Sequence, residues 1–125
     1  MLTSNHITAE LIADGIHVHP VAIDVLIRCK GVDNIAMISD NVQLAGLPDG
    51  EYGHLVKKGG TIRMIGFDDS TDGSMAGSMW TLDHNIRFLV QQMSLPLPSV
   101  IRMATSVPAR IAGVDGYKGT LQVGK

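Results

Sequence analysis

Two short apolar runs, separated by a segment with helical spacing, restrict the fold more than any other feature of the sequence. The first run, ELIADGI over residues 10–16, ends in Asp-Gly and predicts a buried strand that leads into a loop. The second, NIAMIS over residues 34–39, is apolar nearly throughout and predicts a strand covered on both faces. Between them, His-Pro at 19–20 marks a helix start and Lys-Gly at 30–31 marks its end. Strand, helix, strand is the right-handed crossover unit of an α/β fold.

The rest of the chain predicts hairpins followed by helices. Gly and Asp are dense between Asn41 and Gly73, and residues 61–67 are the clearest strand there, so we expect one or two hairpins with long turns. Helical spacing returns after Gly77, where Leu82, Ile86 and Leu89 form one face. Two further short helices are predicted to open at the Leu-Pro and Val-Pro pairs of 97–98 and 107–108, and the tail predicts a turn and a short strand.

Composition excludes several classes of function. A net charge of -2 with scattered basic residues argues against nucleic acid as a partner. No apolar run reaches the roughly 18 residues of a membrane-spanning helix, and the N-terminus lacks a signal-peptide pattern, so we expect a cytoplasmic protein without a membrane partner. The single Cys29 allows neither an internal disulfide nor a cysteine-based zinc site, and is predicted to be a small buried side chain.

Polar residues follow both predicted strands where catalytic groups of parallel α/β proteins lie. Asp14 to His17 follow the first strand, and Ser-Asp-Asn, centred on Asp40, follows the second. A partly desolvated carboxylate at such a strand end is suited to general acid/base chemistry, although Asp is also a common turn residue. His17 and His19 could also present two imidazoles to one metal if their segment were extended, but Pro20 favours His19 as a helix entrance.

Four blocks of the sequence, in order, resemble the C-terminal part of the N-acetylglucosamine-6-phosphate deacetylases of the amidohydrolase superfamily. They are AELIADGIHVHP from Ala9, SDN-x-x-x-AGLPDGEY from Ser39, MAGSMWTLDHNIRFLV from Met75 and VIRMATSVPARIAGVDGYKGTLQVGK from Val100. The resemblance covers essentially the whole chain but less than half of a family member. It implies the C-terminal part of a TIM-like (β/α)₈ barrel, about strands 6–8, with residues 1–125 as one partial barrel domain and a β-hairpin insertion at about 50–73.

The resemblance also implies a reaction and its residues. The family hydrolyses N-acetylglucosamine 6-phosphate to glucosamine 6-phosphate and acetate in amino-sugar catabolism, using a divalent metal, zinc or iron. Asp40 falls on the aspartate that takes a proton from water and passes it to the leaving amine. The loop of Asp14, Gly15, Ile16 and His17 falls on a substrate-contacting loop in which the histidine faces the sugar phosphate. Met75, Ala76 and Gly77 fall on a second substrate-contacting turn.

Some features depart from the family pattern. The usual Thr-Asp-Ala around the acid is Ser-Asp-Asn here, and Met79-Trp80 replaces smaller residues. The family's metal ligands, a glutamate and two histidines, have no counterparts in these residues, so we expect no metal on this polypeptide and no deacetylase activity from it alone. Part of a barrel would expose apolar faces, which predicts a homo-oligomer. There are two alternatives to a segment of this deacetylase. The chain could belong to another amide hydrolase or deaminase of the superfamily, or it could be a non-catalytic oligomerisation module.

Overall fold

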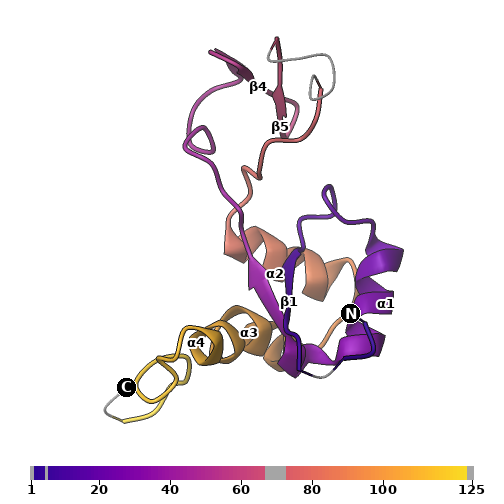
Figure 1. Ribbon diagram of the computed structural model, residues 1–125, viewed down its shortest axis with the longest axis vertical. Helices are drawn as coiled ribbons and strands as arrows, with labels where there is room; N and C mark the ends of the chain where they lie inside the picture. Colours follow the sequence, from indigo (N-terminus) through magenta and orange to yellow (C-terminus); the bar gives the residue numbers. More distant parts are fainter. Residues whose placement is uncertain (1, 5, 67–72, 124–125) are drawn as a thin grey trace. The chain divides into compact units, whose positions relative to one another are not determined.

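The computed structural model describes residues 2–4, 6–66 and 73–123. These residues fold as two compact units, one formed by Met1–Ile38 with Leu82–Lys125 and the other by Ser39–Thr81. Figure 1 shows all the elements in chain order by colour. The assignment of the whole chain to one partial barrel domain stays a prediction.

The first unit contains the strand–helix–strand motif expected from the sequence. Strands β1 (Ala9–Ile12) and β2 (Ile35–Ile38) are parallel, with Ala9 opposite Ile35 and Ile12 opposite Ile38. Helix α1 (Pro20–Lys30) connects them, and the 3₁₀ helix η1 (Val32–Asn34) leads directly into β2. Proline occupies the first turn of α1 and Gly31 caps its end, as predicted.

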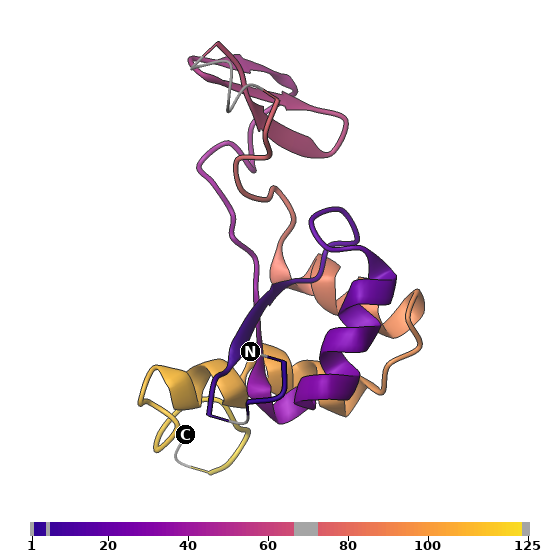
Figure 2. The same cartoon turned by 45° about the vertical axis from the view of Figure 1, so that its right-hand side comes forward.

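Three helices complete this unit. They are α2 (Leu82–Gln91), α3 (Leu97–Ala104) and α4 (Ser106–Ile111). Helices α3 and α4 contact β2, and α2 packs on α3. Figure 2 shows α1 beside the strands, with α3 and α4 on another side of them. All three helices lie where proline positions and apolar spacing predict them.

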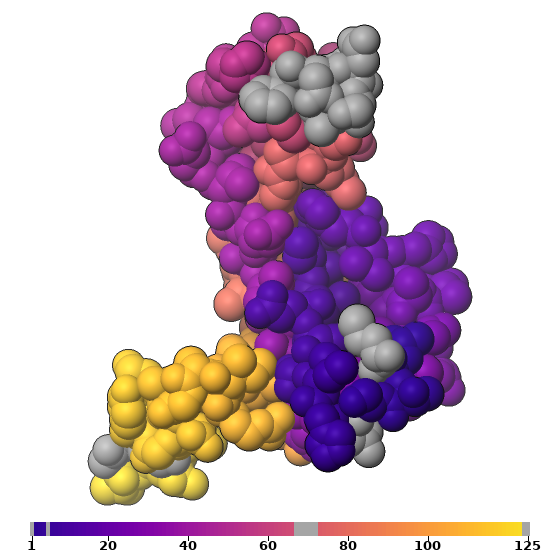
Figure 3. All heavy atoms as spheres, in the orientation of Figure 1, coloured from indigo at the N-terminus to yellow at the C-terminus, as the bar shows by residue number. Residues whose placement is uncertain are grey.

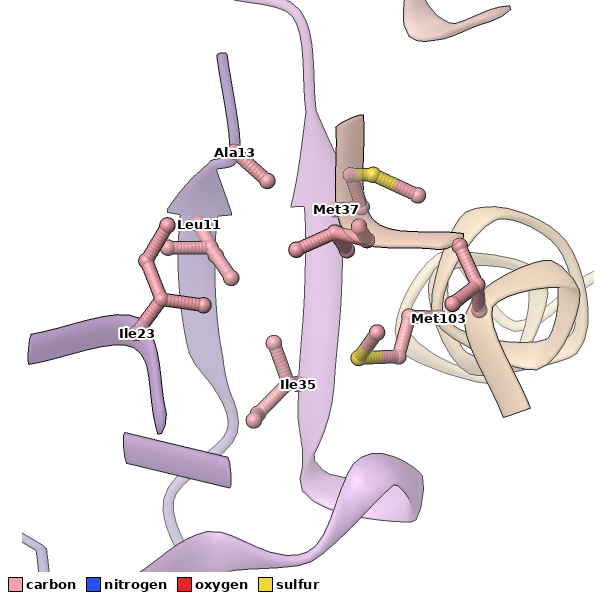
Figure 4. Close-up of a cluster of buried hydrophobic side chains, with 8 residues drawn as sticks. Leu11, Ala13, Ile23, Ile35, Met37 and Met103 are labelled. Atoms are coloured by element: carbon pink, nitrogen blue, oxygen red, sulfur yellow. The ribbon is translucent and has the colours of Figure 1, made fainter. Parts of the chain in front are cut away.

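The core of the first unit lies around the two strands. Figure 4 shows Ile23 of α1 beside Leu11 of β1, and Met103 of α3 approaching Met37 of β2. Ile35, Met37 and the residue between them are all buried, so β2 is covered on both faces, as its unbroken apolar run predicts. Each such side chain contributes about 1.5–3 kcal/mol through burial.

The N-terminal segment is tied to the end of α1. Lys30 is buried, and its Nζ donates hydrogen bonds to the carbonyl oxygens of Ser4 and Ile7. Figure 3 shows this segment, in indigo, lying against α1. The contact satisfies a buried ammonium with carbonyl oxygens, because its N–H donors can be shared among such acceptors.

The second unit is a three-stranded antiparallel sheet with a partly paired fourth segment. Strands β3 (Gly50–Tyr52), β4 (Leu55–Lys58) and β5 (Thr61–Met64) follow in order, and Met75 pairs with Arg63 of β5. Two-residue turns connect β3 to β4 and β4 to β5, so these two turns are shorter than expected, whereas the connection from β5 to Met75 includes residues outside the described ones. Gly-Gly at 59–60 suits such a tight turn, because glycine tolerates the required backbone angles. The strand predicted to reach Phe67 ends at Met64, and Phe67 is outside the described residues.

Three other expectations differ from the structure. The first strand ends at Ile12, because Asp14 turns the chain. Cys29 is exposed on α1 rather than buried, since it lies on a different helix face from Ile23. The described tail, to Val123, contains no strand; its Val114 carbonyl oxygen instead accepts hydrogen bonds within turns from Tyr117 and Lys118.

None of the described helices has the length and apolarity needed to cross a membrane.

Candidate active site

The loop after β1 is organised by an Asp–His pair. The Oδ2 atom of Asp14 lies 2.7 Å from Nδ1 of His17. The Oδ1 atom accepts hydrogen bonds from the backbone N–H groups of Ile16, at 2.9 Å, and His17, at 3.0 Å. This is an Asx turn whose second oxygen holds an imidazole. The aspartate and histidine predicted to lie on one loop are therefore in direct contact.

The Asp14 carboxylate is ionised by its hydrogen bonds in spite of burial. Its side chain is fully buried. Burial acts to raise the pKa of Asp14, but the two backbone N–H groups and the His17 ring together hold that pKa below its ordinary value. A carboxylate in this state accepts hydrogen bonds and donates none.

The other ring nitrogen of His17 is not used by the loop. Nε2 is buried and has no hydrogen-bond partner among the described residues. A buried polar atom without a partner is unusual in folded proteins and often marks a functional position. His19 has a different role, because its Nδ1 accepts a hydrogen bond from the backbone N–H of Val21 and caps α1. The two histidines do not form the metal pair considered from the sequence.

Gly15 allows this loop to pack closely on helix α2. Its φ is +78°, and a Cβ atom at this position would lie 2.5 Å from Cε2 of Phe88. Any other residue would therefore meet both backbone strain and the aromatic ring. The side chain of Ile16, the remaining predicted residue of this loop, is exposed.

The predicted catalytic Asp40 and the predicted turn of Met75, Ala76 and Gly77 come together within the second unit. The Ser78 N–H donates to the Asp40 carbonyl oxygen at 2.8 Å, and the Val42 N–H donates to the Ser78 carbonyl oxygen at 3.2 Å. These two bonds form an isolated parallel bridge between Asn41 and Ser78. We refer to this backbone contact between residues 40–42 and 77–78 as the Asp40 clasp.

Gly77 makes the Asp40 clasp possible. Its φ is +76°, and a Cβ atom there would lie 2.5 Å from Cγ1 of Val42 and 2.9 Å from the Asp40 carbonyl oxygen. Asp40 itself has a φ of +50°, which is uncommon for a residue with a side chain and occurs most often in Asp and Asn outside glycine. Such backbone conformations are frequent at functional sites. The Asp40 side chain is exposed, so the partial desolvation expected from the sequence is not provided by the described residues.

The Met75–Gly77 turn is also attached to the sheet. The Ala76 N–H donates to the Ile62 carbonyl oxygen at 2.9 Å, which continues the pairing of Met75 with β5. The turn is therefore held by β5 on one side and by Asp40 on the other. This arrangement explains the glycine at 77, since a Cβ atom there would meet Val42 and the Asp40 carbonyl oxygen.

Asn85 of helix α2, in the first unit, is a buried polar residue that the sequence interpretation missed. It is fully buried on α2 and donates from Nδ2 to the carbonyl oxygen of Ile38, the last residue of β2, at 3.1 Å. Its Oδ1 is buried without a partner among the described residues. A single amide between Leu82 and Ile86 on an apolar helix face was the available signal.

The described residues do not provide a metal site of their own. No group of three or more His, Cys, Asp or Glu side chains within residues 2–4, 6–66 and 73–123 is arranged to hold an ion. The zinc or iron that the family resemblance implies therefore does not fit the described residues alone, and we derive no chemical step through it.

Comparison with known proteins agrees with the sequence and the fold. The profile of the amidohydrolase family matches residues 3–125. The chain is 40% identical over 128 residues to an N-acetylgalactosamine-6-phosphate deacetylase of Escherichia coli O157:H7, covering 99% of this chain and 32% of the relative. It is 35% identical over 124 residues to an N-acetylglucosamine-6-phosphate deacetylase of Vibrio furnissii, covering 96% and 29%. A shorter protein of Escherichia coli K12 is also 40% identical, and the chain covers 72% of it.

Solved structures extend the same relationship. The crystal structure of N-acetylglucosamine-6-phosphate deacetylase from Pasteurella multocida aligns with a TM-score of 0.85 at 29% identity, over 99% of this chain and 32% of that one. The chain thus spans about a third of the length of this structure and of the two deacetylases named above. The resemblance found in the four sequence blocks is confirmed: the chain belongs to the amidohydrolase family.

Proposed function

We propose that this chain contributes the proton-transferring aspartate and two substrate-contacting loops to the active site of an N-acetylglucosamine-6-phosphate deacetylase. The observation that carries the proposal is the Asp40 clasp. It holds an aspartate two residues after a buried strand and against the glycine of the 75–77 turn. Family membership and the names of the relatives support the same reaction class.

The proposal includes a position in the barrel. We infer that β1 and β2 are neighbouring strands of a (β/α)₈ barrel, at about strands 6 and 7, because they are parallel and joined by a helix. Asp14 and Asp40 each lie two residues beyond opposing strand ends, Ile12 and Ile38. Loops at the carboxyl ends of neighbouring barrel strands share one face, and that face carries the active site.

Asp40 would serve as general base and then general acid. Its carboxylate takes a proton from the attacking water as the oxygen bonds to the acetamide carbonyl carbon. The protonated carboxyl then gives this proton to the amide nitrogen as the C–N bond breaks, which releases acetate and the amino sugar. His17 and the backbone of residues 75–77 would bind the sugar phosphate.

A second substrate candidate has its own support. The relative from Escherichia coli O157:H7 that is 40% identical carries the name N-acetylgalactosamine-6-phosphate deacetylase, whereas the Vibrio furnissii glucosamine relative is 35% identical. The two sugars differ only in the configuration of one hydroxyl group. Discrimination between them therefore depends on a few hydrogen bonds at the sugar, a kind of contact that can separate substrates strongly.

Acetate release from both sugar phosphates tests the proposal. The measurement uses the protein encoded by the complete reading frame that contains these residues, with Asp40→Asn and, as matched control, Asp24→Asn on the exposed face of α1. We expect turnover of at least one sugar, lost by about 10²-fold or more in Asp40→Asn and kept in Asp24→Asn. Full turnover in Asp40→Asn would contradict the role of Asp40, and turnover of neither sugar would contradict the substrate class.

Metal content tests whether the metal ligands lie outside these 125 residues. We expect the 125-residue polypeptide, purified alone, to hold no stoichiometric metal and to release no acetate, because its described residues contain no ligand cluster. Elemental analysis after dialysis measures this. One equivalent of zinc or iron per chain would refute it. A homo-oligomer is also expected, and light scattering of the same sample measures its mass.

A further inference from the structure

We propose that Asp14 is a positioning residue that fixes His17 in the tautomer with its proton on Nδ1, leaving Nε2 as a hydrogen-bond acceptor for a hydroxyl group of the substrate. The inference rests on the proposed function and deepens it. It assigns Asp14 an indirect role, through the imidazole, in place of a contact with substrate.

Both oxygens of Asp14 are occupied by its own loop. Oδ1 accepts from two backbone N–H groups, of Ile16 and His17, and Oδ2 contacts Nδ1 of His17 at 2.7 Å. The side chain is fully buried, whereas the His17 side chain keeps 16% of its surface exposed. The solvent-accessible surface of this pair therefore belongs to the histidine and not to the aspartate.

The charge state of Asp14 determines where the imidazole proton lies. Hydrogen bonds from two backbone N–H groups and from His17 hold the pKa of Asp14 below its ordinary value in spite of burial, so the carboxylate is ionised near neutral pH. An ionised carboxylate can only accept, and the ring nitrogen beside it must donate. The proton of a neutral His17 is therefore on Nδ1.

The remaining nitrogen is then an acceptor without a partner. Nε2 of His17 is buried and makes no hydrogen bond to any of the described residues. An acceptor in this state is satisfied by a ligand that brings an O–H or N–H group. Sugars offer several hydroxyl donors, so the chemistry matches the substrate class proposed above.

The loop is rigid enough for the orientation to matter. Gly15 contacts the Phe88 ring so closely that no Cβ atom would fit, and the Asx turn fixes the backbone of residues 14–17. A preset ring loses little freedom when substrate binds, which favours both affinity and geometry.

The sharpest variant is Asp14→Asn. The amide oxygen can replace Oδ1 in the turn, while the amide NH₂ group faces Nδ1 and donates to it. This forces Nδ1 to accept and moves the ring proton to Nε2. Asp24→Asn is the matched control, because Asp24 also accepts a hydrogen bond from a side chain at 2.7 Å, that of Arg28, but on the exposed face of α1.

Nitrogen-15 NMR of the His17 ring measures the tautomer directly. In the unmodified protein we expect a protonated Nδ1 and an unprotonated Nε2, with the reverse pattern in Asp14→Asn and no change in Asp24→Asn. A protonated Nε2 in the unmodified protein would overturn the inference even if Asp14→Asn failed to fold.

Kinetics of the complete-frame protein supply the second test. We expect Asp14→Asn to lower kcat/KM for the hydrolysed sugar phosphate by about 10- to 100-fold. Because Asp14 acts through His17, the Asp14→Asn/His17→Gln pair should lose no more than His17→Gln alone. Multiplicative losses would show an independent role for Asp14 and overturn the inference. If neither sugar is hydrolysed, the proposed function fails while the NMR result still decides the role of Asp14.

Discussion

The backbone N–H of Ser78 donates a 2.8 Å hydrogen bond to the carbonyl oxygen of Asp40. This bond joins two segments that are almost forty residues apart in sequence. It orients the peptide of Asp40 rather than its carboxylate, so the side chain stays accessible while its backbone is fixed. Backbone support of this kind allows a catalytic group to be held without using the atoms that react.

Gly77→Ala should separate these two segments. A Cβ atom would lie 2.5 Å from Cγ1 of Val42 and 2.9 Å from the Asp40 carbonyl oxygen, at a φ of +76°. A displacement of about 1 Å at Asp40 predicts a loss of roughly 10²-fold in kcat/KM, measured with the complete-frame protein. Gly46→Ala, in a loop of the same unit with open space around it, is the control and should be close to neutral. Equal activity of both variants would contradict the role given to Gly77.

Lys57→Met should destabilise the second unit. Lys57 is buried and its Nζ donates to the carbonyl oxygens of Leu44, Ala45 and Leu47, so methionine would remove three hydrogen bonds from the loop of residues 44–47. We expect a loss of about 2–3 kcal/mol in the free energy of unfolding.

Urea unfolding followed by tryptophan fluorescence measures this loss. The only tryptophan of the chain, Trp80, lies in the same unit and against Gly60, and therefore reports on it. Lys58→Met, at an exposed neighbour on β4, is the control and should change little. A Lys57→Met midpoint equal to that of the control would refute the stabilising role of the three carbonyl contacts.

Gly15→Ala should destabilise the first unit through Phe88. The added Cβ atom would lie 2.5 Å from the ring and the residue would have to adopt a φ of +78°, which together predict a loss of about 1–3 kcal/mol. In the double variant with Phe88→Ala this clash is removed. Its loss in the free energy of unfolding should therefore be smaller than the sum of the losses of the two single variants. Circular dichroism with urea gives the three free energies. Additive losses would mean that the ring and the glycine do not interact.

Acid should weaken the protein partly through Asp14. Because the pKa of Asp14 is lower in the folded chain than its ordinary value, its contribution to stability is complete above the ordinary carboxyl pKa. That contribution is lost as the pH falls from about 5 through the lower folded pKa. We therefore expect the free energy of unfolding to fall less steeply with acid in Asp14→Asn than in the unmodified protein. Glu10→Gln, exposed on β1, should keep the original slope. Identical slopes for Asp14→Asn and the unmodified protein would contradict this prediction.

The sequence predicted most elements because their signals are local. Pro20 and Gly31 at the ends of α1, and the unbroken apolar run of β2, depend on the chain near them and were confirmed. The prediction that Cys29 is buried was wrong, because residue type gives only a tendency to burial, whereas the position on the helix decides whether the side chain is exposed. The turns from β3 to β4 and from β4 to β5 are shorter than expected because Gly-rich sequence is compatible with both tight and long connections.

The candidate site was only partly accessible from the sequence. Its residues came from family resemblance, whereas the hydrogen bond of Asp14 with His17 and the bond of Ser78 to Asp40 required coordinates. Neither contact leaves a pattern in composition or periodicity. Their roles in catalysis stay predictions until the variants above are measured.

The bridge between Asn41 and Ser78 closes the intervening chain into a loop with a common entrance and exit. The closure separates the three-stranded sheet within the loop from the chain on either side of the bridge. Strands β3 to β5 could gain or lose residues over evolutionary time while the aspartate at the entrance kept its backbone frame. Variation in that sheet is thus uncoupled from the backbone geometry of Asp40.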